Sequence, residues 1–293
     1  MSTPTPEHDP SRREAPKPSI LDEIVLNKRE EVERAKAALS MVELESLVAQ
    51  ADPPRNFFRA ITRRARARQT AIIAEIMQRT PTAGVIRSED AGDGFDPARI
   101  ATLYERNGAS AISCLTDERY FGGSLSYIQR IKEVCGLPVL RKDFLIDPWQ
   151  LWESRAAGAD AVLLIAECLQ EGPLVDMLIL AQRLGMTVLL EVHSMENLLR
   201  MRPYVGFPHP SYCLLEINNH DLSNTKPDLN HTLRLIDLVD DPSVVVSATG
   251  IMTHRDLERL AQVGVYAALV GEDLLREPDP GFALAQLLSP TSL

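Results

Sequence analysis

The sequence predicts an α/β fold, a single (β/α)8 TIM barrel preceded by a helical extension. Eight short apolar segments alternate with eight amphipathic ones, and no glycine-rich dinucleotide turn is found, because Gly92-x-Gly94 lacks a third glycine and opens no helix. The apolar runs are nearly continuous, as expected of parallel strands buried on both faces. The predicted strands are residues 71–77, 110–116, 137–143, 160–166, 186–192, 211–218, 243–249 and 266–272.

The segments between these strands carry apolar residues at helical spacing. They predict helices near 97–107, 124–135, 148–157, 170–184, 194–201, 228–239, 253–263 and 280–289. Residues 20–70 are interpreted as a helical extension, residues 71–293 as the barrel, and the polar, proline-rich residues 1–19 as a disordered tail. The extension ends in an arginine-rich segment that is typical of a solvated helix face.

The composition excludes several classes of protein. A net charge of −10 argues against a broad nucleic-acid surface, although a local cationic pocket for a small anion is compatible with it. No apolar run is long enough to span a membrane, and the N-terminus lacks the apolar core of a secretory signal. The four cysteines form no C-x-x-C pair and are expected to be reduced core residues. We therefore expect a cytoplasmic protein.

Active sites of TIM barrels lie at the carboxyl ends of the strands. Lys142 and Glu191 stand near the ends of two predicted strands, where a charge is costly unless it has a partner or a chemical role. They are candidates for an acid–base couple. The alternative is a structural salt bridge between them across the barrel mouth.

Two glycines, Gly250 and Gly271, follow the seventh and eighth predicted strands. Barrels often bind phosphate through backbone N–H groups of these two loops, where glycine permits close approach. A simple tight turn is the alternative. His193 and Glu196 are interpreted as a capping or surface pair rather than a metal site.

Four segments resemble the indole-3-glycerol-phosphate synthase family. They are VLRKDFLIDPWQLWESRAAGADAVLLIA (139–166), ISCLTDERYFGGSL (112–125), LLEVHSMENL (189–198) and INNHDL (217–222). The resemblance extends from about Ile20 to Leu288. It implies an enzyme of tryptophan biosynthesis that decarboxylates and ring-closes 1-(2-carboxyphenylamino)-1-deoxyribulose 5-phosphate, without a metal or organic cofactor.

The resemblance also implies roles for individual residues. Lys142 would be the general acid and Glu191 the general base, with Glu75 and Asn218 holding these groups and the substrate hydroxyls. The remaining substrate positions are an apolar wall of Pro81, Phe121 and Phe144, a hydroxyl at Thr80, and a phosphate site of Thr249, Gly250 and Gly271. The partner would be a small sugar phosphate, and the choice between monomer and homodimer stays open.

Three positions depart from the family's pattern. Met77 stands where the family has lysine, His220 where it has arginine, and Ala248 where it has glutamate. Two cations and one anion are therefore lost from the expected site, and Arg79 is a candidate to compensate. Three hypotheses follow: a working synthase, a divergent relative that acts on another phosphorylated substrate, and a non-catalytic barrel retained for binding or assembly.

Overall fold

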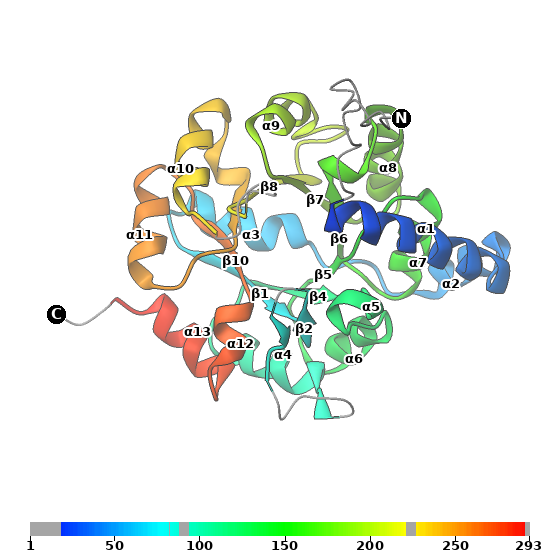
Figure 1. Ribbon diagram of the computed structural model, residues 1–293, viewed down its shortest axis with the longest axis horizontal. Coiled ribbons are helices and arrows are strands. Elements are labelled where there is room, and N and C mark those ends of the chain that lie inside the picture. The colour runs from blue at the N-terminus through cyan, green and yellow to red at the C-terminus, as the bar shows by residue number, and fades with distance from the viewer. Residues whose placement is uncertain (1–18, 82, 88–93, 221–226, 291–293) are drawn as a thin grey trace, which may run out of the picture.

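The computed structural model describes residues 19–81, 83–87, 94–220 and 227–290. Its eight long strands are all parallel and close into a barrel in the order β1-β10-β9-β8-β7-β6-β5-β4 (Figure 1). They are β1 (Ala71–Ile76), β4 (Ala111–Leu115), β5 (Val139–Lys142), β6 (Ala161–Ile165), β7 (Thr187–Val192), β8 (Cys213–Asn218), β9 (Val245–Ala248) and β10 (Ala267–Val270). The predicted fold class is confirmed, and each strand falls inside a predicted one.

Eight helices follow these strands and cover the outside of the barrel (Figure 1). They are α4 (Pro97–Arg106), α6 (Ser126–Val134), α7 (Pro148–Ala156), α8 (Glu171–Arg183), α9 (Met195–Met201), α10 (Asn230–Leu235), α11 (His254–Gln262) and α13 (Pro280–Leu288). Several begin with a side-chain cap; at α7 the carboxylate of Asp147 accepts from the N–H of Trp149, and Pro148 occupies the first turn. The predicted helices are thus present, most of them shortened by one to three residues, whereas the helix predicted for 228–239 is divided into α10 and a 3-10 turn.

Several short elements are not predicted as such by the sequence, although the one at residues 236–238 falls within the helix predicted for 228–239. They are the hairpin of β2 (Arg79–Thr80) and β3 (Gly84–Val85), the helices α5 (Glu118–Phe121) and α12 (Glu272–Arg276), and the 3-10 turns η3 (Ala166–Cys168), η4 (Arg202–Tyr204), η5 (Ile236–Leu238) and η6 (Pro242–Val244). Each spans too few residues for a hydrophobic period to develop. Both α5 and the hairpin lie after strands of the barrel, on the side where the site is expected.

The core has two layers, because alternate residues of each strand face opposite sides. Outward residues pack under the helices, while inward residues such as Ile73 and Leu140 fill the barrel. Phe57, Phe58 and Ile61 of α3 (Phe57–Arg66) join the inner layer together with the first residues of several strands. Helix α3 therefore closes the amino-terminal end of the barrel, which leaves the carboxyl-terminal end for chemistry.

Buried ion pairs fix helix α1 (Ile20–Ala38) to the loops after β4 and β5. The Lys28 ammonium is 2.8 Å from Asp117 and 2.9 Å from Asp143, and all three side chains are buried. Burial opposes ionisation of Asp143, but Arg141 and Lys28 hold its pKa well below the usual range. Since Asp143 directly follows Lys142, α1 is connected to the strand end that carries a candidate catalytic group.

The second helix of the extension, α2 (Met41–Gln50), packs on α7, and like α1 it begins with a capping box. Within the described ranges, no helix has both the length and the apolar character needed to cross a membrane.

Replacement of Lys28 by methionine should destabilise the protein by about 3–5 kcal/mol, because the buried Asp117 loses its cationic partner and the buried Asp143 keeps only Arg141. Urea unfolding measures the effect. The matched control is Lys36→Met, which removes the half-exposed pair of Lys36 with Asp147 and should cost about 1 kcal/mol or less. Equal losses in the two variants would contradict the importance of the buried network.

Candidate active site

Four of the predicted site residues meet at the carboxyl end of the barrel. Glu75, Lys142, Glu191 and Asn218 lie on β1, β5, β7 and β8, in phase with the inward residues of their strands. The Lys142 ammonium is 3.1 Å from Oε2 of Glu75, and Nδ2 of Asn218 donates to Oε1 of Glu191 at 2.7 Å. The mouth thus contains two adjoining pairs, each joining a carboxylate to a nitrogen donor.

Lys142 is held in its charged form. Burial alone would lower its pKa, but the carboxylates of Glu75 and Glu191 raise it above the ordinary value. The hydroxyl of Ser113 donates to the same Glu75 oxygen at 3.0 Å and so helps to fix that carboxylate. The alternative of a Lys142–Glu191 salt bridge is wrong, because each residue has a different ionic partner.

The partner of Glu191 is His193, two residues later on the same chain segment. Its Nε2 is 3.0 Å from Oε1 of Glu191, and its Nδ1 is 3.2 Å from Oε2 of Glu167. Although burial opposes protonation, these carboxylates raise the pKa of His193 to about 10. In turn His193 and Lys142 hold the pKa of Glu191 well below its usual range, despite its burial. The capping or surface role expected of His193 is therefore wrong.

A further carboxyl group in this cluster, Glu216, was missed in the sequence. It lies in the middle of β8, in register with Glu191 of β7, and is fully buried. The signal was present, because Glu216 is two residues before Asn218 and a strand places such residues on one face. The rule that barrel sites lie at strand ends favours the last polar residue of each strand, which in β8 is Asn218.

The two predicted aromatic residues lie side by side above the inner core. The rings of Phe121, at the end of α5, and Phe144, directly after β5, have centroids 6.1 Å apart. Thr80 belongs to the β2–β3 hairpin, where its hydroxyl accepts from the N–H of Ala83, and Pro81 is exposed in the turn that follows. Thr82 lies outside the described residues.

The loop after β9 has a left-handed backbone at Thr249 (φ 69°) and Gly250 (φ 72°). Its position is fixed by Asn219, whose Nδ2 donates to the carbonyl of Thr249 at 2.9 Å and to Ser247 at 3.0 Å. Glycine is needed for close packing as well, since a Cβ on Gly250 would lie 2.8 Å from Pro227. The loop is built as a tight, pinned turn beside the mouth.

Gly271 directly follows β10 and is the N-cap residue of α12. A Cβ at this position would lie 2.7 Å from the Cβ of Glu75 and 2.8 Å from the Cε of Met77. The absence of a side chain therefore makes room for β1 residues of the site. The methionine that replaces the family's lysine is buried against this glycine.

The other two departures lie nearby. Ala248 ends β9, is fully buried, and is in register with Asn218. The N–H of His220 donates to Oδ1 of Asn218 at 3.0 Å, and its side chain is half-buried. These positions therefore adjoin the Glu191–Asn218 pair, where a change of charge affects the candidate base.

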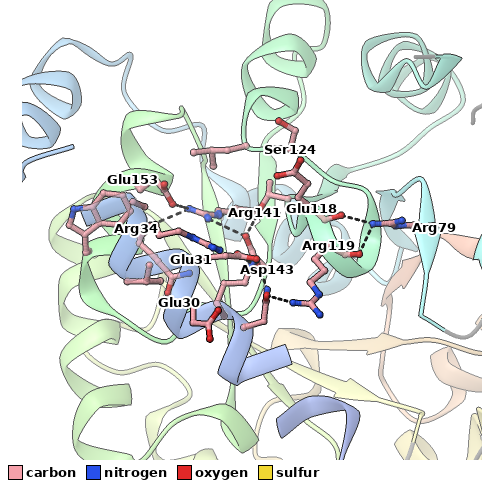
Figure 2. A pocket seen from close by; sticks show the side chains of 18 residues that line it. Glu30, Glu31, Arg34, Arg79, Glu118, Arg119, Ser124, Arg141, Asp143 and Glu153 are labelled. Atoms are coloured by element: carbon pink, nitrogen blue, oxygen red, sulfur yellow. Dashed lines mark hydrogen bonds and ion pairs between the residues drawn. The ribbon is translucent and has the colours of Figure 1, made fainter. Parts of the chain in front are cut away.

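Arg79 does not take the place of the lost cations. Its guanidinium donates to the carbonyl of Glu118 at 2.8 Å and also to that of Arg119, both on α5 (Figure 2). It lines a cavity of about 790 Å³ beside α1, together with Arg141 and Asp143. Arg141 of β5 faces away from the barrel interior there and binds Glu153 at 2.8 Å, so this cavity lies on the flank of the barrel.

The chemistry available at the mouth is acid–base catalysis. It offers a charged lysine, an ionised glutamate and fixed polar groups in a site shielded from water. In the described part of the chain no group of three or more histidine, cysteine, aspartate or glutamate side chains is arranged to hold a metal ion.

Comparison with known proteins identifies a family. The family model described as indole-3-glycerol phosphate synthase matches residues 21–287. Two curated relatives, the indole-3-glycerol phosphate synthases of two strains of Acidithiobacillus ferrooxidans (ATCC 53993 and ATCC 23270), are each 42% identical to this chain over 272 residues. The aligned region covers 92% of this chain and 98% of each relative.

Solved structures agree in fold. Orotidine 5'-phosphate decarboxylase from Pyrococcus horikoshii OT3 matches with a TM-score of 0.52 and 15% identity, over 74% of this chain and 97% of its own. A protein from Aquifex aeolicus VF5 matches with a TM-score of 0.55 and 12% identity, over 80% of this chain and 97% of its own. At these identities the likeness concerns the barrel alone.

Replacement of His193 by glutamine should remove a stabilising charge whose effect depends on pH. The folded pKa of His193, about 10, exceeds the ordinary histidine value, so its contribution is complete below about pH 6.5 and is lost as pH rises through 10. The stability difference between wild type and His193→Gln should therefore shrink by roughly 4 kcal/mol across this window, as measured by urea unfolding.

Glu167→Gln is the control for this pH effect, because it removes one of the two carboxylates that contact His193. It should reduce the slope of wild-type stability against pH without abolishing it. A stability difference between wild type and His193→Gln that stays constant from pH 6.5 to 10 would show that His193 is not held as a cation.

Proposed function

This chain belongs to the indole-3-glycerol phosphate synthase family, and we propose from this premise that it is a carboxy-lyase of tryptophan biosynthesis. Its substrate is 1-(2-carboxyphenylamino)-1-deoxyribulose 5-phosphate. The ring carbon that bears the carboxylate bonds to the ribulose carbonyl carbon, and carbon dioxide and water leave to give indole-3-glycerol phosphate. The observation that carries the proposal is the pairing of Lys142 with Glu75 beside that of Glu191 with Asn218.

Lys142 acts as the general acid. Attack on the carbonyl places negative charge on its oxygen, which needs a proton, and the resulting hydroxyl later needs a proton to depart as water. The Lys142 ammonium is fully charged and projects from the end of β5 toward the mouth, where Glu75 and Ser113 fix its direction. A positioned donor avoids the entropic cost of recruiting an acid from solvent.

Glu191 acts as the general base that removes a proton as the indole double bond forms. Its low pKa keeps it ionised at neutral pH, and Asn218 and His193 each hold its Oε1. The aromatic pair Phe121 and Phe144 lines the path of the anilino ring. The backbone at Gly250 and Gly271, with the Thr249 hydroxyl, receives the phosphate. Thr80 offers a hydroxyl to the substrate, and Pro81 belongs to the apolar wall around the ring.

A second candidate function is favoured by one observation: Met77 and Ala248 are buried apolar residues at positions where the family has charged ones. If the loss of charge reshapes the end of the pocket that takes the anthranilate carboxylate, a different phosphorylated substrate becomes preferred. Binding of the family substrate and of other sugar phosphates, compared by thermal shift with inorganic phosphate, separates the two functions.

The direct test is turnover of the carboxyphenylamino-deoxyribulose phosphate, followed by indole fluorescence from pH 5.5 to 8.5. Lys142→Met and Glu191→Gln should each lower kcat by about 100- to 10,000-fold, the usual effect of removing a positioned acid or base. Lys36→Met is the control, because Lys36 pairs with Asp147 outside the mouth. Absence of turnover by the wild-type protein across this range would overturn the proposal.

Restoring the three departing residues tests whether they limit the rate. The combined variant Met77→Lys, His220→Arg and Ala248→Glu should raise kcat/KM by about tenfold or more, since a charge-assisted hydrogen bond contributes about 1.5–3 kcal/mol. Circular dichroism confirms folding. If the wild-type protein shows no turnover and the folded triple variant shows none either, the result would favour a non-catalytic barrel.

A further inference from the structure

Among the described residues, Glu216 is a buried ionisable group of the mouth that the proposed mechanism leaves without a role. Its side chain is fully buried, and neither carboxylate oxygen has a hydrogen-bond partner. A buried ionisable group without partners costs free energy, so its retention beside a reactive pair points to a function. The inference drawn from it rests on the proposed function.

The surroundings of Glu216 disfavour a negative charge. Across the sheet it is in register with Glu191 on β7 and with the apolar Val246 on β9. The charged groups that face it from other elements are Glu75 of β1, Lys142 of β5 and His193 after β7. Both cations already have nearer partners, because Lys142 contacts Glu75 and His193 contacts Glu191. A third carboxylate charge here would have no donor to stabilise it.

The titration of Glu216 agrees with this geometry. Burial and the neighbouring charge of Glu191 raise its pKa to about 8. At neutral pH the group is therefore a neutral carboxylic acid, and it ionises in mildly alkaline solution.

We propose that Glu216 is a positioning residue for the acid–base pair: its uncharged carboxyl group leaves the Lys142 ammonium to Glu75 at the mouth, and its ionisation draws that ammonium into the barrel. A charged Glu216 competes with Glu75 for Lys142 and strengthens the hold of Lys142 on its proton. Both effects weaken Lys142 as an acid toward substrate, so activity falls when Glu216 ionises.

The test is the pH profile of kcat for wild type, Glu216→Gln and Glu216→Asp. Wild-type kcat should fall about tenfold from pH 7 to pH 9, because a group with a pKa of about 8 ionises in this interval. The other ionisable neighbours shift away from it, since the pKa of His193 is raised to about 10 and that of Glu191 is lowered. For Glu216→Gln, the ratio of kcat at pH 7 to kcat at pH 9 should be near one. Glu216→Asp keeps a carboxyl group and should therefore keep the alkaline fall in kcat.

A measurement that does not depend on turnover accompanies the profile. The folded pKa of Glu216 exceeds the unfolded value of about 4.3, so wild-type stability falls as pH rises from there to about 8. Glutamine cannot ionise. The excess of the Glu216→Gln Tm over the wild-type Tm should therefore grow steadily from pH 5 to pH 8.

The outcomes are distinguishable. An alkaline fall that persists unchanged in Glu216→Gln, or one that is absent from wild type, would overturn the positioning role. A Tm difference that is constant between pH 5 and pH 8 would overturn the uncharged state on which the role depends. A wild-type protein with no turnover at any pH would instead contradict the proposed function, and the positioning role would fall with it while the Tm comparison still reported the charge of Glu216.

Discussion

The cost of burying charge at the end of an apolar barrel governs the arrangement of this site. Glu75, Glu191 and Glu216 enter the same small volume as Lys142, and water is too scarce there to screen them. Glu75 is paired with Lys142 of another strand, and Glu191 is paired with His193, which follows the same strand. A carboxylate in this site is therefore ionised where it has a hydrogen-bond or ionic donor and neutral where it has none. Glu191 is thus an ionised base and Glu216 a neutral carboxylic acid, although the two side chains are chemically identical.

The same principle extends from the mouth to the helical extension. Asp143, the residue after Lys142, is ionised because Arg141 and Lys28 flank it, and Lys28 comes from α1. The outward side of β5 thus has its own charge network on the flank of the barrel, separate from the inward one that Lys142 serves. The end of β5 is therefore held by charge pairs on its outward face and by others on its inward face, and together they limit the movement of Lys142.

Much of this organisation could be predicted from the sequence. The eight strands are apolar runs with turn signals between them, and the rule that barrel sites lie at strand ends selected Glu75, Lys142, Glu191 and Asn218. The place of His193 and of Glu216 in the site could not be predicted in the same way, for two different reasons. The role of His193 depends on Glu167, which belongs to another β/α unit, and no local pattern reveals such a contact. Glu216 lies within β8, two residues before Asn218, and only side-chain alternation along the strand indicates that it faces the barrel interior. The helices α5 and α12 are too short to produce a periodic signal.

The closure of the barrel by α3 affects how substrate enters and how product leaves. Phe57, Phe58 and Ile61 seal one end with tightly packed side chains, and the inner apolar layer continues this seal up to the charged groups. Within the described residues, the site is therefore closed toward the amino-terminal end of the barrel and lies at its carboxyl-terminal end. Substrate therefore enters at the carboxyl-terminal end of the barrel, and the indole product leaves there. The bulky product must then leave before the next substrate can bind. The shape of the barrel therefore sets the order of these two steps.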